Sequence, residues 1–258
     1  MTFIRSLAYA VWFYLSLVVI GLVCMPASLF SRGAAMGAIR FWCGAQRLAL
    51  RGLCGIRTEF RGLQNLPQGP CIIAMKHQST YDTLAPFLFI RDPVFILKKE
   101  LLRAPVFGVY ASRVGIPIDR GGRVRTMKAM LASARDAAKS DRQIVIFPEG
   151  TRQQVDAPTE FKPGVVAMYN DLNIVCVPVA LNTGLCWKSF WRKPGHVVFE
   201  ALKPIEPGLE RRAFMQRLKD ALEPATARLV AEGRAAQGKH AEAPPVVSPD
   251  APKPEPGA

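Results

Sequence analysis

Residues 71–82, CIIAMKHQSTYD, join a short apolar run to a polar turn that carries a histidine and an aspartate. The five apolar residues Cys71–Met75 predict a buried strand. Ser79 or Thr80 is a suitable N-cap for a helix that begins directly afterwards. His77 is therefore expected at a strand-to-helix turn, where loop side chains face a cleft.

Strands and helices continue to alternate along the chain after Gly55. Further apolar runs predict strands at Val94–Leu97, Ile144–Phe147, Ile174–Leu181 and Val197–Leu202. Helical patterns lie near Tyr81–Ile90, Val106–Arg113, Val124–Lys139 and Val165–Leu172. A last helix begins near Leu209 and is expected to be interrupted at Pro224. The pattern predicts an α/β fold with helices on the faces of a sheet.

The N-terminal segment has the composition of a membrane anchor. Ser6–Ser31 is a run of 26 residues without a charged side chain, which is long enough to cross about 30 Å of hydrocarbon as a helix. Gly33–Leu53 fits an amphipathic helix in which Arg40, Arg47 and Arg51 can meet anionic headgroups. Positive charge after the apolar run predicts that the following domain lies on the cytoplasmic side of the cell membrane. The apolar run either spans the bilayer or enters one leaflet, and its length disfavours a cleaved signal peptide.

Three regions follow from these patterns. Residues 1–54 are expected to form membrane-anchoring helices and residues 55–232 a single catalytic domain. Residues 233–258 are expected to be a disordered tail, because six prolines lie between positions 244 and 256.

The net charge indicates which class of partner the protein binds, and the cysteine spacing indicates whether a metal site or a disulfide is expected. The formal net charge is +14, and residues 1–58 contain six arginines and no acid, so anionic membrane lipid is the expected partner. Nucleic acid is disfavoured because the chain has no zinc-finger spacing, no aromatic RNA-binding motif and no basic repeat. The six cysteines show no Cys-x-x-Cys and no His-paired metal spacing, so we expect neither a disulfide nor a metal site. We expect no cofactor either.

His77 is the one histidine of three that is well placed for chemistry. Asp82, five residues later, can fold back under the ring and accept the Nδ1 proton, which leaves Nε2 free to act as a general base. The alternative is ordinary, because Asp82 is also a suitable first-turn acid for a helix.

Two further blocks carry charge at the ends of apolar runs. One is Gly115–Arg120, GIPIDR, and the other is Phe147–Arg152, FPEGTR. Arginine matches phosphate oxygens with a planar fork, so Arg120 and Arg152 are candidate phosphate ligands, with Lys98 as a third cation. Each is alternatively a solvated surface charge. Pro178 indicates an edge strand or the lip of a cleft.

The order of four blocks, His77-x4-Asp82, Gly115–Arg120, Phe147–Arg152 and Val177–Val179, resembles the 1-acyl-glycerol-3-phosphate O-acyltransferase family over about residues 55–205. The resemblance implies a mixed sheet flanked by helices, with His77 as the base and Asp82 as its orienting acid. It implies phosphate or glycerol contacts from the following set: Lys98, Arg120, Glu149, Gly150, Thr151 and Arg152. The segment Phe161–Gly164 departs from the family pattern by a proline, outside the four blocks.

The implied reaction moves a fatty acyl group from acyl-CoA or acyl carrier protein to the free hydroxyl of 1-acyl-glycerol-3-phosphate and forms phosphatidic acid in phospholipid biosynthesis. No Gly-x-Ser-x-Gly nucleophile elbow is present, so direct attack by the acceptor hydroxyl is favoured. Backbone N–H groups near Gly150 are candidates for the oxyanion site. Two alternatives stay open: the same chemistry on another lysolipid, such as a lyso-ornithine lipid or lysophosphatidylcholine, and a non-catalytic protein that binds anionic lipid.

Overall fold

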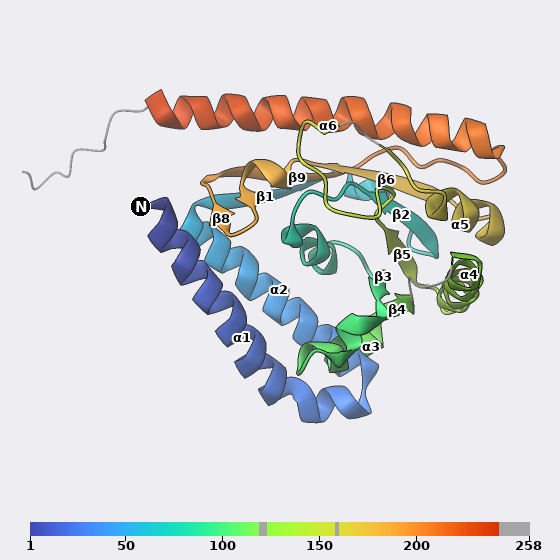
Figure 1. Ribbon diagram of the computed structural model, residues 1–258, viewed down its shortest axis with the longest axis horizontal. Coiled ribbons are helices and arrows are strands. Elements are labelled where there is room, and N and C mark those ends of the chain that lie inside the picture. Colours follow the sequence, from blue (N-terminus) through green and yellow to red (C-terminus); the bar gives the residue numbers. More distant parts are fainter. Residues whose placement is uncertain (119–122, 158–159, 243–258) are drawn as a thin grey trace, which may run out of the picture.

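The computed structural model describes residues 1–118, 123–157 and 160–242 of the 258-residue chain (Figure 1). Within these residues one seven-stranded sheet has the order β1-β9-β6-β2-β5-β3-β4. The strands are β1 Ile56–Arg61, β2 Cys71–Met75, β3 Pro93–Lys98, β4 Gly115–Ile118, β5 Gln143–Ile146, β6 Cys176–Leu181 and β9 Gly195–Ala201. Within this sheet, the β6–β9 pair is antiparallel and the other pairs are parallel. The predicted α/β class with a mixed sheet is confirmed.

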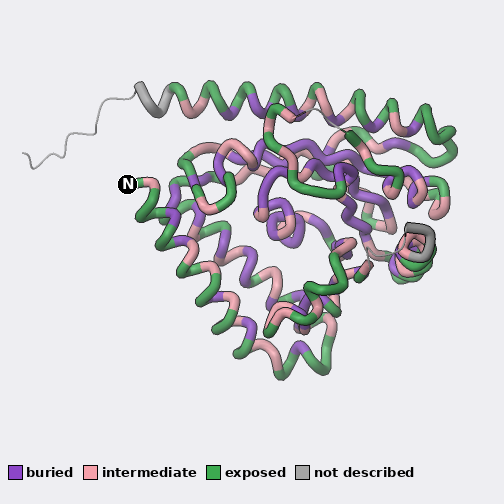
Figure 2. The backbone as a smooth tube through the Cα atoms, in the orientation of Figure 1, coloured by how far each residue is buried: buried purple, intermediate pink, exposed green. Residues whose placement is uncertain are grey.

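Helices cover both faces of this sheet (Figure 1). They are α1 Thr2–Phe30, α2 Arg32–Cys54, α3 Phe107–Val114, α4 Arg123–Lys139, α5 Gly164–Leu172 and α6 Arg211–Glu242. The central strand β2 is buried on both sides, as its continuous apolar run predicts. Ile72 and Ala74 pack in the core with α4, α5 and α6, whereas Ile73 and Met75 pack with α1 and α2. Figure 2 shows the sheet as a buried layer between exposed helices.

The helix expected near Tyr81–Ile90 is replaced by two 3₁₀ helices, η2 Thr80–Thr83 and η3 Ala85–Leu88. The physical reason is Pro86, which has no N–H to donate and disfavours helical backbone at the residue before it. The turn after β2 is consequently shorter and tighter than the sequence suggests.

Pro178 lies in a central strand, so its assignment to an edge is wrong. Its backbone atoms face β9 at the point where that strand ends. The Leu202 N–H donates to the Pro178 carbonyl at 2.9 Å, and proline has no N–H to return the second bond. Only one ladder hydrogen bond is therefore lost, just beyond the last residue of β9.

The C-terminal helix α6 runs without interruption through Pro224 to Glu242, so the expected break at Pro224 and the tail beginning at residue 233 are both wrong. Leu222 and Leu229 are fully buried on either side of Pro224, and this packing holds the helix across the missing bond. Residues 233–242 are rich in alanine, the best helix former. The predicted proline-rich part of the tail, 243–258, lies outside the described residues.

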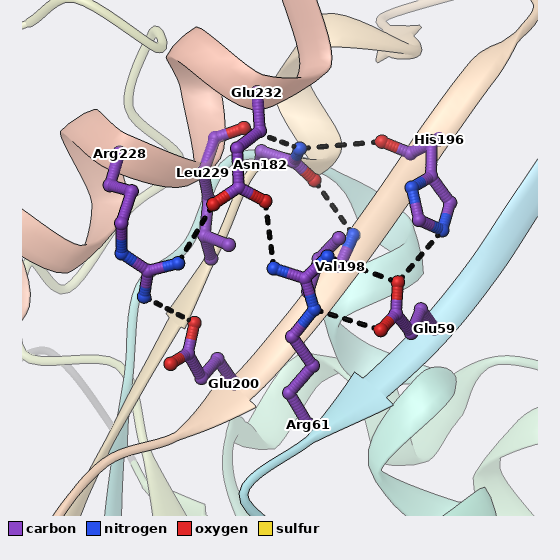
Figure 3. A network of polar contacts seen from close by, with 9 residues as sticks. All are labelled: Glu59, Arg61, Asn182, His196, Val198, Glu200, Arg228, Leu229 and Glu232. Atoms are coloured by element: carbon purple, nitrogen blue, oxygen red, sulfur yellow. Dashed lines mark hydrogen bonds and ion pairs between the residues drawn. The ribbon is translucent and has the colours of Figure 1, made fainter. Parts of the chain in front are cut away.

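A polar network fixes α6 to β1 and β9 (Figure 3). At its centre Asn182 is fully buried: its carbonyl accepts from Val198 N at 2.8 Å and its amide donates to Leu229 O at 2.9 Å. Arg61 bonds Glu59 and Glu232, and this hydrogen bonding lowers the pKa of both carboxyl groups. Further contacts of the same network join Arg228 to Glu200 and Glu232, and His196 to Glu59.

Helix α1 is oriented with its serines inward. Ser6, Ser16 and Ser28 are buried, while most of its large apolar side chains are exposed. Ser16 Oγ accepts from Trp42 Nε1 at 3.1 Å and from Gln46 Nε2 at 2.9 Å, which ties α1 to α2. Within the described chain α1 is the one helix long and apolar enough to cross a membrane, judged by length and composition alone.

Two of the three arginines expected to face lipid headgroups are engaged by the folded domain. Arg40 donates to the carbonyls of Ile90 and Arg91. Arg47 donates to Thr58 O at 3.4 Å and lies over the Phe60 ring. Both side chains thus contact the folded domain, and their contact with lipid headgroups stays a prediction.

Candidate active site

The parallel strands of the sheet run in the same direction, and this brings the candidate residues together at one edge of the sheet. His77 follows β2, Phe147 follows the adjacent strand β5, and Lys98 ends β3 beyond it. Thr183 follows β6 on the other side of β2. Because these strands are parallel, their carboxyl ends meet at the same edge, which is where open α/β sheets bind ligands.

His77 and Asp82 form the expected pair. His77 Nδ1 lies 3.1 Å from Asp82 Oδ2. A carboxylate accepts hydrogen bonds, so this contact favours the tautomer with hydrogen on Nδ1 and a free lone pair on Nε2. The His77 side chain is 13% exposed and the Asp82 side chain is fully buried, so the ring can be reached while its partner cannot.

Asp82 is held by more than the imidazole. Its Oδ2 accepts from the backbone N–H groups of Gln78 at 2.6 Å and Ser79 at 2.7 Å. Its Oδ1 accepts from Ser79 Oγ at 3.0 Å and Thr183 Oγ1 at 2.6 Å. Ser79 caps η2 and completes a capping box with Asp82. The carboxylate is thus an ordinary first-turn acid and a partner of His77 at the same time.

Both carboxylate oxygens of Glu149 contact groups within the protein. Its side chain is fully buried, and Oε1 pairs with Lys76 Nζ. Its Oε2 accepts from the backbone N–H of His77 at 2.9 Å. The FPEGTR turn is therefore connected to the histidine turn by a buried carboxylate, which fixes the His77 backbone from behind.

Two further contacts join these turns. The Phe147 ring stacks on the His77 imidazole with centroids 4.0 Å apart and an angle of 16° between planes. The Gln153 N–H donates to the His77 carbonyl at 2.8 Å.

Gly150 has φ +70°, a conformation that favours glycine, and its N–H donates to Phe147 O at 2.9 Å. That N–H is already used in the turn, which removes it from the candidate oxyanion donors.

An apolar cavity of about 620 Å³ begins at this edge and extends between the sheet and the N-terminal helices. Its inner wall includes Leu17 and Gly21 of α1, Trp42 of α2 and Tyr110 of α3. His77, Lys98 and Arg152 are among its few polar lining residues. The cavity is suited to a long hydrocarbon chain with an anionic group at one end.

The predicted phosphate-binding residues are brought together in part. Lys98, Gly150, Thr151 and Arg152 line the cavity, whereas Glu149 is turned into the protein. Arg120 lies outside the described residues. These placements leave the proposed role of each residue a prediction.

Lys162 also lines the cavity and was missed in the sequence. Its N–H donates to Pro148 O at 2.7 Å, so the Phe161–Gly164 segment does contact the FPEGTR block. Its ammonium is 2.9 Å from Glu160 Oε1. The one available signal was the following proline, which begins α5 beside the site.

No group of three or more His, Cys, Asp or Glu residues able to hold a metal ion occurs in the part of the chain that the structure describes. Five of the six cysteines are buried. Burial raises the pKa of the Cys71 and Cys186 thiols to about 12, so both are poor nucleophiles at neutral pH.

Comparison with known proteins finds acyltransferases. Residues 57–182 match the family described as Acyltransferase. A 1-acyl-sn-glycerol-3-phosphate acyltransferase of Pseudomonas aeruginosa is 36% identical over 162 residues, which cover 62% of this chain and 63% of that protein. The alpha form of the mouse enzyme of that name is 29% identical, over 59% of this chain and 56% of that protein. The chain thus matches less than two thirds of the length of either relative.

A solved structure shares the fold. The crystal structure of the 1-acyl-sn-glycerophosphate acyltransferase PlsC from Thermotoga maritima superimposes with a TM-score of 0.71 at 21% identity. The match covers 94% of this chain and 99% of the other. It includes the N-terminal helices as well as the sheet.

Proposed function

We propose that the protein is an acyltransferase that transfers a fatty acyl group from an acyl thioester to the free hydroxyl of 1-acyl-glycerol-3-phosphate and so forms phosphatidic acid. The match of residues 57–182 to the Acyltransferase family supports this proposal. The observation that carries the proposal is the His77–Asp82 pair, whose histidine lines a largely apolar cavity of about 620 Å³. The names of the relatives support the choice of acceptor.

The chemical step needs one base and no covalent enzyme intermediate. His77 Nε2 takes the proton of the acceptor hydroxyl as its oxygen attacks the thioester carbonyl carbon. The tetrahedral intermediate then expels the thiolate by breaking the C–S bond, and the imidazolium gives its proton to the sulfur. Asp82 fixes the tautomer and stabilises the imidazolium while it exists.

The acceptor phosphate is assigned to the cations at the cavity mouth. Lys98 and Arg152 line the cavity and are exposed, and Lys162 is a third exposed cation among the lining residues. Guanidinium and ammonium groups bind phosphate by charge-assisted hydrogen bonds. Arg120 belongs to the proposed set on the grounds of its sequence block alone.

We place the protein at the cell membrane with its catalytic domain on the cytoplasmic side. The exposed apolar face of α1 supports membrane association. Both α1 and α2 pack on the catalytic domain, and α1 contributes to the cavity wall. This arrangement supports entry into one leaflet, because a lysolipid can then reach the cavity while its phosphate stays in the headgroup zone.

The decisive experiment is an acyl-transfer assay on the full chain purified in mild detergent. We expect phosphatidic acid from 1-acyl-glycerol-3-phosphate, and parallel reactions with acyl-CoA and acyl carrier protein identify the donor. Lyso-ornithine lipid and lysophosphatidylcholine serve as competing acceptors. His77→Ala should lower turnover by about 100- to 10,000-fold. Transfer at the parent rate by this variant, or preference for another acceptor, would refute the proposal.

A further inference from the structure

A short hairpin near the N-terminus of α1 has two distinct faces. Strands β7 Trp187–Lys188 and β8 Trp191–Arg192 pair antiparallel, with Trp187 opposite Arg192 and Lys188 opposite Trp191. Trp187 and Arg192 are buried, whereas Lys188 and Trp191 are exposed. One cross-strand pair therefore faces the protein, and the other faces outward.

The inward pair attaches the hairpin to α1. The Arg192 guanidinium lies over the Trp187 ring at 4.3 Å and the Tyr9 ring at 5.2 Å. The Arg192 N–H donates to Ser6 Oγ at 2.9 Å. Tyr9 and Trp187 meet edge to face at 5.4 Å. The hairpin and the first turns of α1 consequently form one rigid unit, visible where β8 meets the N-terminal end of the chain in Figure 1.

The outward side of this unit is aromatic. Phe3 of α1 contacts Phe190 and Trp191, with ring centroids 5.8 Å and 6.1 Å apart. Phe3 is 54% exposed and Trp191 is 46% exposed. Exposed Ile4 and Leu7 continue this surface along α1. Three clustered aromatic side chains at the end of an apolar helix face match the aromatic belts found at membrane–water interfaces.

The charged residues of the hairpin segment and of the first turns of α1 are all positive. Lys188, Lys193 and Arg5 are exposed, and no acid occurs in residues 186–195 or in residues 1–58. A basic ring around exposed aromatics is complementary to a surface that is apolar below and anionic above.

We propose that the β7–β8 hairpin is a second membrane-contact site, at which Phe190 and Trp191 enter the headgroup–acyl boundary of an anionic bilayer while Lys188 and Lys193 bind lipid phosphates. The site fixes the N-terminal end of α1 at the interface and sets the depth at which the cavity mouth lies. The proposal rests on the membrane association included in the proposed function, and it does not depend on acyl transfer.

Vesicle binding of the full chain tests the proposal. Phe190→Ser/Trp191→Ser should lower partitioning onto phosphatidylcholine–phosphatidylglycerol vesicles by about tenfold. Lys188→Gln/Lys193→Gln should lower it about tenfold or more on these vesicles, with little change on pure phosphatidylcholine. Leu209→Ser is the matched control: Leu209 is 38% exposed and precedes α6, at the opposite end of the molecule from β8. It should bind like the parent.

Quenching of tryptophan fluorescence by brominated lipid measures how deeply Trp191 enters the bilayer, independently of the affinity for vesicles. Trp191→Phe should bind vesicles normally but show less quenching by brominated lipid than the parent. Unchanged partitioning of the aromatic double variant, together with unchanged quenching in Trp191→Phe, would overturn the proposal. A change in oligomeric state without a loss of vesicle binding would overturn it too, because the aromatic cluster would then contact a second copy. If the parent shows Trp191 quenching but no acyl transfer, the proposed function fails and this site stands.

Discussion

Lys76→Met tests the buried pair Lys76–Glu149, which lies next to the backbone of His77, the proposed catalytic base. Lys76 contacts Glu149, whose carboxylate is fully buried and also accepts from the His77 N–H. Removing the ammonium leaves a buried anion without this cation, a change that costs about 3–5 kcal/mol. For a domain of this size the loss corresponds to a fall in Tm of roughly 6–20 °C.

A compensating variant separates the charge from the shape. In Lys76→Met/Glu149→Gln, the glutamine carbonyl can still accept from His77 N–H and neither member carries a buried charge. Most of the lost stability should return, because a neutral pair avoids the desolvation of two ions. Turnover should fall in Lys76→Met and largely return in the double variant, since the histidine turn and the FPEGTR turn together hold the imidazole in place. The KM for the thioester should change less than kcat in both variants.

Thermal unfolding in detergent, followed by circular dichroism, measures the effect on stability. Lys219→Met is the matched control, because Lys219 forms an exposed pair with Glu223 on α6 and such pairs contribute only about 0.3–0.5 kcal/mol. A loss in Lys76→Met as small as that of the control would refute the reasoning. Strict additivity in the double variant would refute it as well.

Three further predictions concern the acceptor, the core and the pH response. Arg152→Ala should raise the KM for lysophosphatidic acid by about ten- to a hundredfold, with a smaller change for the thioester; equal changes for both substrates would indicate a structural role. Asn182→Leu should lower the free energy of unfolding by about 2–4 kcal/mol, because it leaves Val198 N–H and Leu229 O buried without their partner, and urea titration measures this. The hydrogen bond to Arg61 is the first cause of the lowered pKa of Glu232, so this carboxylate adds stability above the normal carboxyl range that is lost as the pH falls through the lowered value. Glu232→Gln should reduce the loss of unfolding free energy at acid pH by less than about 1 kcal/mol, since the pair is partly exposed. An unchanged acid dependence of the unfolding free energy would contradict the assignment.

The local parts of the site were predictable from the sequence. His77 and Asp82 lie within one turn after a strand, so short-range geometry fixes their contact. The apolar run Cys71–Met75 is continuous because β2 is covered on both faces. Periodicity reports such environments directly.

The missed features depend on contacts between distant segments. Glu149 contacts Lys76 across 73 positions, so the sequence alone did not distinguish a buried brace from a phosphate ligand. Strand β1 was not predicted because Ile56–Arg61 contains only two apolar residues and is ordered by pairing with β9. Pro178 is tolerated in the middle of the sheet because its missing N–H faces the end of β9, and the end of β9 depends on tertiary structure.

Because the serines of α1 face inward, its inward and outward positions can tolerate different substitutions over evolutionary time. The segment that resembles a simple anchor also supplies Ser16 to α2 and Leu17 and Gly21 to the cavity wall. Its outward positions can drift among apolar residues, whereas its inward positions are constrained by the shape of the cavity. Exchanging α1 for an unrelated hydrophobic helix should therefore preserve attachment to the bilayer yet alter which chain lengths fit, so that substrate range and membrane attachment are inherited together.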